Sequence, residues 1–339
     1  MTVKVSPSQL KPMIIHCFKR KIVPMIHGSP SSSKSSIVRQ IAKEANLLVI
    51  DVRLSQFDPV FLLGLPDVKK DLAELIPFDI FPLEGQPLPE GKAGWIIFLD
   101  EFNSCTKAVQ SASYKIVLDR MIGQAHLHSK ARVVLAGNLA TDNAIVNEMS
   151  TAMQSRVTHF EVEMTPRDFL DYAITEKMEP RMITFLEHRP SLVTKFDPEH
   201  NDKTYPCSRN WETVSKAITG TDFERWLLPL VQGTVGEGAG LEFYNFCQLK
   251  DHLPSFGSIV ANPDTCEVPD KPSHRYALAS LIVESINTTN AVKVMEYVER
   301  LPMEYCYLVV RMAIKMNPEL LAVDAIDDWV TTNASRFYG

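Results

Sequence analysis

Residues 22–46 read IVPMIHGSPSSSKSSIVRQIAKEAN and contain the pattern that decides the fold. An apolar run at residues 22–27 stops at Gly28, and residues 36–46 then carry apolar side chains at helical spacing. A serine-rich loop that ends in Lys34 and Ser35 joins the two. A phosphate-binding loop needs these parts, because its N–H groups and lysine hold phosphates while its hydroxyl reaches Mg²⁺. The predicted phosphate-binding residues are Gly28, Ser29, Pro30, Ser31, Ser32, Ser33, Lys34, Ser35 and Ser36.

One position of this loop departs from the usual pattern, because Ser33 stands before Lys34 where glycine is expected. Glycine adopts left-handed backbone geometry without steric cost, whereas serine does so at about 1 kcal/mol. A flexible serine-rich linker is the alternative interpretation of SPSSSKSS. A linker would not be expected between an apolar strand and an amphipathic helix, so the phosphate loop is favoured. We expect the serine to affect phosphate affinity and turnover more than the fold.

The overall composition is that of a mildly acidic chain able to form a core. Of 339 residues, 45 % are apolar, and 35 Lys and Arg against 41 Asp and Glu give a net charge of −6. This balance argues against a protein that coats polyanions, although it leaves room for a local basic patch. No run of about 18 apolar residues is present, so we expect no membrane span. The six cysteines form no CxxC pair, which favours a reducing, cytoplasmic setting.

Residues 1–165 alternate short apolar runs with helical patterns, which is typical of an α/β fold with a parallel sheet. Buried parallel strands are continuously apolar, and such runs lie at residues 22–27, 47–52, 95–99, 133–136 and 160–164. Residues 56–94 are rich in proline and lack periodicity, so we expect a long insertion there. Residues 122–133 alternate weakly and indicate a hairpin.

From residue 165 onward the pattern becomes helical, as in SRNWETVSKAI at residues 208–218. Residues 251–273 are rich in Pro, Asp and Ser, which predicts a linker or a surface loop. Two further helices are expected at about residues 276–286 and 291–316.

A second motif follows the apolar run WIIFL, which ends in the acidic pair Asp100 and Glu101. Such a strand places Asp100 at the carboxyl edge of the sheet, where open α/β sheets bind ligands. We expect Asp100 to hold Mg²⁺ through its water, together with the hydroxyl of Ser35, and Glu101 to polarise the attacking water. Two solvated acids at a strand end are common, but the order and spacing of the two motifs favour a nucleotide site.

Two further polar residues follow the acidic pair. Asn138 comes directly after VVLAG and could orient the attacking water, although an Asn after a strand is usually a turn residue. Arg156 lies just before the last strand and could reach a neighbouring subunit's nucleotide as an arginine finger. A surface arginine at a helix end is the alternative interpretation for Arg156.

These motifs together resemble the MoxR-type AAA+ ATPases, the bacterial and phage ring ATPases that include the CbbQ/NorQ-like proteins. The resemblance covers roughly residues 8–250 and includes WIIFLDEFNSCTKAVQSASYKIVLDRMIG and VVLAGNLATDN, at residues 95–123 and 133–143. It implies an α/β P-loop NTPase of the AAA+ type, with a parallel sheet flanked by helices, in residues 1–165. A small all-α lid domain would follow at residues 166–250, and a C-terminal helical extension at residues 251–339.

The resemblance also implies roles for single residues. It makes Lys34 and Ser35 the Walker A residues, Asp100 and Glu101 the Walker B pair, and Asn138 sensor 1. Arg156 matches the arginine finger, and Arg209 falls where the sensor 2 arginine of the lid is expected.

The function implied is Mg²⁺-dependent ATP hydrolysis by a ring, expected to be a homo-hexamer, that remodels a partner protein. Members of this family often act with a von Willebrand A-type protein, so such a partner is expected. Two alternatives stay open. Because of Ser33, the chain could be a nucleotide-binding scaffold with weak hydrolysis. A nucleic-acid-stimulated motor on the same core is less favoured, given the net charge of −6.

Overall fold

The computed structural model describes residues 3–29, 32–69, 72–139, 147–195 and 203–333. The chain divides into two compact units, Met1–Thr165 and Pro166–Gly339. The elements of the first unit, with short 3₁₀ helices labelled η, are β1 (Lys4–Val5), α1 (Pro7–Arg20), β2 (Pro24–His27), α2 (Lys34–Glu44), β3 (Leu48–Arg53), η1 (Leu54–Gln56), α3 (Pro59–Leu63), β4 (Leu65–Lys69), β5 (Leu72–Ile76), β6 (Trp95–Asp100), α4 (Lys107–Ala112), α5 (Tyr114–Leu118), β7 (Met121–Ile122), β8 (Ala125–His126), β9 (Ala131–Gly137), α6 (Thr151–Gln154) and β10 (Thr158–Val162).

The first unit is built on a six-stranded sheet with the order β1-β10-β2-β9-β6-β3, and every pairing in it is parallel. The five strands predicted from apolar runs are all present, and β1 is an additional short edge strand. Strand β2 lies between β9 and β10, and β9 lies between β2 and β6. The strand ends that carry the predicted phosphate loop, Asn138 and the acidic pair therefore meet at one edge of the sheet.

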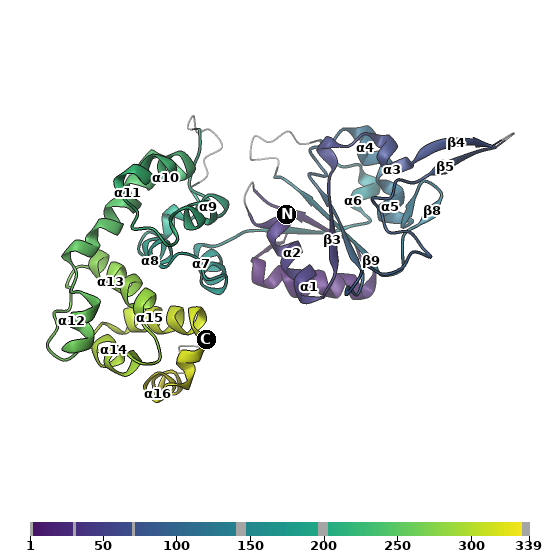
Figure 1. Cartoon of the computed structure of the whole chain (residues 1–339). Coiled ribbons are helices and arrows are strands. Elements are labelled where there is room, and N and C mark those ends of the chain that lie inside the picture. Colours follow the sequence, from purple (N-terminus) through teal and green to yellow (C-terminus); the bar gives the residue numbers. More distant parts are fainter. Residues whose placement is uncertain (1–2, 30–31, 70–71, 140–146, 196–202, 334–339) are drawn as a thin grey trace. The chain divides into compact units, whose positions relative to one another are not determined.

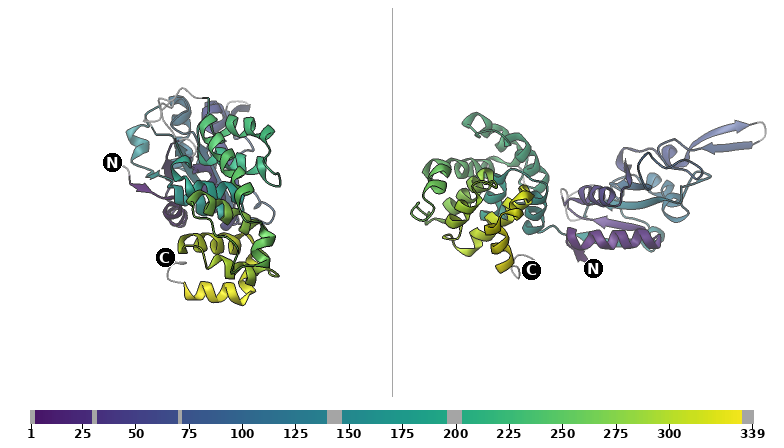
Figure 2. Two further views of the ribbon diagram at one scale, coloured as in Figure 1. Left: turned by 90° about the vertical axis from the view of Figure 1, so that its left-hand side faces the viewer. Right: turned by 60° about the horizontal axis from the view of Figure 1, so that its bottom comes forward.

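Helices cover both faces of this sheet (Figure 1, Figure 2). On one face, α1 and α2 pack apolar side chains against Ile26, Ile96 and Val134. On the other face, α4, α5 and α6 pack against Ile97 and Leu135. Neighbouring strand residues such as Ile96 and Ile97 enter opposite layers, because successive side chains of a strand point to opposite faces. Burial on both faces explains why these strands are continuously apolar.

The predicted insertion contains its own structure. After β3, the chain forms η1, α3 and the antiparallel ribbon β4–β5, which projects away from the sheet (Figure 1). Gly64, at the start of the ribbon, has φ +94°, and a Cβ there would lie 2.6 Å from the carbonyl oxygen of Ile76. A glycine is therefore needed at this turn. The expected hairpin before β9 is present as β7–β8, paired through Met121 and His126.

The second unit is built of helices among its described residues (Figure 2). Its elements are α7 (Pro166–Thr175), α8 (Pro180–His188), η3 (Pro190–Leu192), α9 (Ser208–Ile218), η4 (Arg225–Leu227), α10 (Leu228–Val235), α11 (Glu237–Cys247), η5 (Gln248–His252), α12 (Phe256–Ala261), α13 (Pro272–Ser285), α14 (Ala291–Val298), α15 (Met303–Met316), η6 (Pro318–Ala322) and α16 (Asp324–Thr332).

The structure corrects two expectations for this unit. Residues 251–273 are not all linker, because they contain α12, which Ser255 caps through a bond from the Ser258 N–H to its hydroxyl. The helix expected at residues 291–316 is two helices, α14 and α15, with Pro302 between them. Proline lacks an N–H and disfavours helical geometry in the residue before it, so α14 ends before this position.

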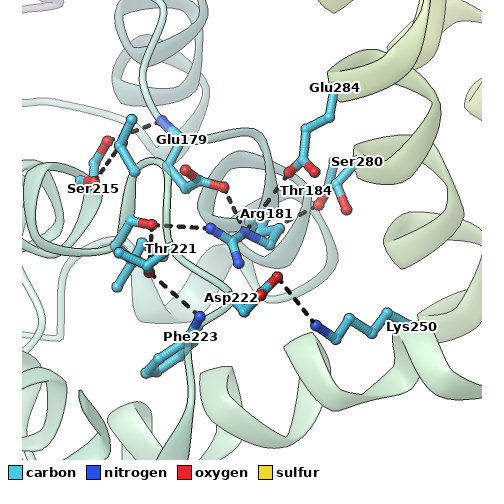
Figure 3. Close-up of polar contacts among 12 residues, drawn as sticks. Glu179, Arg181, Thr184, Ser215, Thr221, Asp222, Phe223, Lys250, Ser280 and Glu284 are labelled. Carbon is cyan, nitrogen blue, oxygen red and sulfur yellow. Dashed lines mark hydrogen bonds and ion pairs between the residues drawn. The ribbon is translucent and has the colours of Figure 1, made fainter.

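The core of the second unit holds a cluster of aromatic rings and a buried ion pair. Phe185, Trp211 and Phe243 are in mutual ring contact, and the Trp211 indole Nε1 donates to the Leu192 carbonyl at 2.7 Å. Next to a cavity of about 500 Å³, the Arg181 guanidinium donates to Glu179 at 2.6 Å (Figure 3). No helix in the described ranges is both long enough and apolar enough to cross a membrane.

Candidate functional site

The loop between β2 and α2 holds its lysine inward. The Lys34 ammonium donates to the carbonyl oxygens of Gly28 at 2.6 Å and Ser29 at 3.0 Å, and only 8 % of Lys34 is exposed. A Cβ on Gly28 would lie 2.4 Å from the hydroxyl oxygen of Ser32 and 2.7 Å from Val162, so the turn has room for glycine alone. Pro30 and Ser31, also predicted to bind phosphate, lie outside the described residues.

Ser33 has the left-handed geometry that glycine would supply in a usual phosphate loop. Its φ is +63° and its ψ is +17°, and it precedes the first residue of α2. Its hydroxyl donates to the sulfur of Met164 at 3.4 Å and does not cap the helix. The chain therefore keeps the loop conformation with serine, at a strain of about 1 kcal/mol. Ser36 lies in the first turn of α2, half-buried.

The first hydroxyl of α2 meets the acid at the end of β6. The Ser35 hydroxyl donates to Asp100 Oδ2 at 3.1 Å, and the Asp100 carboxylate also accepts the N–H of Glu101 at 2.9 Å. These two side chains come from segments 65 residues apart in sequence. A hydroxyl and a carboxylate are oxygen ligands of the kind that Mg²⁺ binds, so the donor set fits this ion.

Glu101 is held by a residue that the motif analysis did not single out. Its φ is +57°, and its carboxylate accepts a hydrogen bond from the Ser55 hydroxyl on η1. Strand β3, which leads into η1, pairs with β6 through Arg53 and Asp100, so Ser55 arrives beside the acid. The serine therefore orients the carboxylate that is the candidate base.

Asn138 lies beside the loop lysine, because β9 and β2 are neighbours. Its Oδ1 accepts from the Lys34 ammonium at 3.2 Å. Its backbone is clamped by Asn103, which donates to the Asn138 carbonyl at 2.7 Å and accepts the Asn138 N–H at 3.0 Å. Asn103 is 6 % exposed and was not predicted, although a polar residue three positions after Asp100 was the available signal. Gly137 leaves room for it, since a Cβ there would lie 2.4 Å from Asn103 Oδ1.

The two predicted arginines are both exposed, and they lie in different compact units. Arg156 is exposed just after α6, and its guanidinium donates to the Ala152 carbonyl of its own turn at 2.8 Å. Arg209 is exposed in the first turn of α9, in the second compact unit. The structure thus brings together Lys34, Ser35, Asp100, Glu101 and Asn138, and leaves both arginines on the surface.

A pair of histidines next to the loop was also not predicted. His27 Nε2 and His159 Nδ1 are 2.9 Å apart, and the rings stack with their centroids 5.2 Å apart. Burial, followed by the charges of His159 and Lys34, lowers the pKa of His27 from 6.5 to about 4. The pair borders a cavity of about 660 Å³ that Asn103 and Asn138 also line.

The parallel strand order, the glycine-dependent turn and the meeting of the loop with the acidic strand confirm the predicted fold class. The first unit is an α/β fold with a six-stranded parallel sheet flanked by helices, and a helical unit follows it in the chain. Across the described ranges, no cluster of three His, Cys, Asp or Glu side chains is arranged to hold a metal ion.

The solved structures to which this chain is similar include three that share little sequence with it. No family model and no curated protein matches the sequence. A putative ATPase from Cytophaga hutchinsonii is similar at 15 % identity and a TM-score of 0.36, over 91 % of this chain and 79 % of that one. NtrX from Brucella abortus in complex with ADP is similar at 13 % identity and a TM-score of 0.35, over 97 % of this chain and 67 % of that one. A second structure of NtrX from Brucella abortus is similar at 14 % identity and a TM-score of 0.39, over 83 % of this chain and 69 % of that one.

Proposed function

We propose that the chain binds ATP with Mg²⁺ at the β2–α2 loop and hydrolyses it. One observation carries the proposal: the Ser35 hydroxyl meets the Asp100 carboxylate at 3.1 Å while Lys34 of the same helix meets Asn138 at 3.2 Å. A loop lysine, a helix hydroxyl, a strand-end acid and a neighbouring amide thus surround one point at the edge of the sheet. Such a set is suited to holding and polarising a terminal phosphate.

Each residue of the set has a distinct task in this proposal. The loop N–H groups and the Lys34 ammonium would bind the phosphates, exchanging bonds that the lysine now makes to carbonyl oxygens. Bound Mg²⁺ would neutralise phosphate charge, with the Ser35 hydroxyl as a ligand and Asp100 holding the ion through its water. Glu101 would accept a proton from the attacking water, and Asn138 would orient that water through its amide.

We further propose that the active form is a ring, a homo-hexamer, in which Arg156 completes the site of the neighbouring copy. In support of this proposal, Arg156 is exposed and is held in position by its bond to Ala152. Arg209 would act from the lid as a second arginine. The remodelled partner would be a protein, for example of the von Willebrand A type, since a net charge of −6 does not favour nucleic acid.

The first experiment measures phosphate release and fluorescent ADP binding for three variants. Lys34→Ala should lose both, because the loop loses its cation. Glu101→Gln should bind ADP normally and lose turnover at least about 100-fold, as expected when a general base is removed. Lys43→Ala, at the far end of α2, is the matched control and should behave as the unaltered chain. Full turnover in both Lys34→Ala and Glu101→Gln would refute the assignment of the site.

The ring is tested by mixing two inactive variants. Arg156→Ala keeps a complete loop, and Glu101→Gln keeps the arginine, so an interface that joins the two has one intact site. Random mixing at equal amounts should restore about a quarter of the sites if neighbours touch head to tail. No recovery on mixing, or full activity of Arg156→Ala alone, would refute an arginine supplied by a neighbour. Sedimentation of the unaltered chain with ATP would give the number of copies.

A further inference from the structure

We propose that His27 and His159 form a positioning relay that couples the phosphate loop to the segment carrying Arg156. The inference rests on the proposed function for its purpose, but its geometry stands in the unliganded chain. His27 is the last residue of β2, directly before Gly28, and His159 lies on the adjacent strand β10. The two rings are stacked 17° from parallel, with Nε2 of the first 2.9 Å from Nδ1 of the second.

The direction of both hydrogen bonds follows from the contact between His159 and the Gln154 carbonyl. His159 Nε2 lies 3.0 Å from the carbonyl oxygen of Gln154, which can only accept. His159 therefore carries its hydrogen on Nε2, and in the neutral ring its Nδ1 has a free lone pair. His27 must then donate from Nε2. The result is one directed chain from His27 through His159 to Gln154, and it requires a lone pair on His159 Nδ1.

The burial and the neighbours of His27 keep that ring neutral. Its pKa is lowered to about 4, first by burial, then by His159 and by the nearby Lys34 ammonium. A neutral ring fixed in one tautomer is a rigid connector, because it has one donor and one acceptor in set positions. The Nε2–H of His27 is therefore held toward His159 Nδ1.

Both ends of the relay lie at residues with a proposed role in hydrolysis. At one end, the Gly28 carbonyl accepts from Lys34 at 2.6 Å, and the turn packs against Val162 of β10 without room for a Cβ. At the other end, Gln154 closes α6, two residues before Arg156. Strand β10 thus touches the loop through Val162 and α6 through His159. A shift of the loop when phosphate binds would be passed to the arginine that acts on the next copy.

The test uses substitutions that separate ring packing from hydrogen bonding. His27→Phe keeps an aromatic ring beside His159 and removes the donor, while His27→Gln returns an N–H where Nε2 lies. His126→Phe, on the exposed β8 strand, is the matched control. Hydrogen exchange of the amides at residues 153–156 is compared without nucleotide and with ADP, and kcat and KM for ATP are measured alongside.

We expect His27→Phe to speed amide hydrogen exchange at residues 153–156 by about three- to tenfold, because the loss of one hydrogen bond has an effect of about this size. ADP should slow that exchange in the unaltered chain and not in His27→Phe. The variant should lower kcat by a similar factor with KM nearly unchanged, because the loop itself is intact. His27→Gln should restore exchange and kcat, and His126→Phe should change neither.

The relay is refuted if His27→Phe leaves exchange at residues 153–156 unaltered, or if His27→Gln matches His27→Phe in every measurement. Should His27→Phe fail to fold, His159→Asn replaces it, since Asn Oδ1 accepts from His27 but cannot reach Gln154. Exchange in that variant must rise to the same extent. If the unaltered chain does not hydrolyse ATP, the proposed function fails, while exchange without nucleotide still decides whether the relay exists.

Discussion

The carboxyl group of Glu284 should make the stability of the helical unit depend on pH. Glu284 lies on α13, 3.7 Å from the Arg181 guanidinium that Glu179 holds at 2.6 Å (Figure 3). Burial, followed by the charge of Glu179, raises the pKa of Glu284 from 4.5 to about 7, against the opposing effect of Arg181 and Lys250. Two carboxylates therefore compete for one guanidinium, and the more exposed of them takes up a proton.

The sign of the effect follows from proton uptake. Below pH 4.5 the carboxyl is protonated in both the folded and the unfolded chain, so it contributes no pH dependence. Between pH 4.5 and 7 the folded chain holds the proton more tightly, so stability falls as pH rises, and above pH 7 the loss is complete. The rise in pKa corresponds to at most about 3 kcal/mol. Because 39 % of the side chain is exposed, solvent screening reduces this to about 1 kcal/mol.

Glu284→Gln removes the titrating group and keeps its shape. Urea unfolding followed by tryptophan fluorescence should give nearly equal free energies for the variant and the unaltered chain at pH 4, below the unfolded pKa of 4.5. At pH 8.5 the variant should be the more stable by about 1 kcal/mol. Glu242→Gln, in an exposed pair with Arg189, is the control and should show no such gain. A variant that is less stable at pH 8.5 would refute the reasoning, since it would mean that ionised Glu284 stabilises the fold.

Three further predictions concern the first compact unit, Met1–Thr165. Ser33→Gly removes about 1 kcal/mol of left-handed strain but adds a similar unfolded-state entropy, so thermal unfolding should shift little. A large rise in turnover in the same variant would show that serine slows the loop, and unchanged turnover would show that serine is accommodated. Because the Ser55 hydroxyl orients the Glu101 carboxylate, Ser55→Ala should lower kcat about threefold at unchanged ADP affinity. A rise in kcat would mean that the serine holds the base back instead of positioning it. Gly64→Ala should cost about 2 kcal/mol in a urea titration, because φ is +94° and the new Cβ meets a main-chain oxygen at the end of β5. Gly91→Ala, also left-handed but with open space around it, should cost clearly less.

The sheet could be predicted from sequence because its central strands are buried on both faces. Ile96, Ile97 and Phe98 are almost fully buried, and a short continuous apolar run is typical of a strand covered on both faces. Strand β1 was not predicted, because its two residues are too few to show a pattern. The β4–β5 ribbon was not predicted for a different reason. Its apolar residues are exposed, with Leu72 at 72 %, so no buried face imposes an alternation.

The same difference separates the parts of the site that were predicted from those that were not. Lys34, Ser35, Asp100 and Asn138 each follow or precede a recognisable strand, and parallel strands end at a common edge. His27 and His159 lie on strands too, but their contact joins positions 132 residues apart in sequence. It depends on β10 pairing directly with β2, which no local pattern shows. The motifs show where strands end, but they do not show which strands are neighbours in the sheet. The histidine contact depends on that second kind of information.

Two residues of the candidate site have positive φ without being glycine, so the presence or absence of glycine is a poor guide to the loop conformation. Ser33 and Glu101 both have positive φ, at +63° and +57°, although neither is glycine. Each costs about 1 kcal/mol, and each is held by neighbours, since α2 begins directly after Ser33 and Ser55 bonds to Glu101. Glycine at position 101 would relieve the backbone strain but could not supply a carboxylate. The proposed chemistry therefore requires a residue that the backbone conformation disfavours. A missing glycine is therefore weak evidence against a phosphate loop when the surrounding strand and helix are present, because those elements hold the strained residue in place.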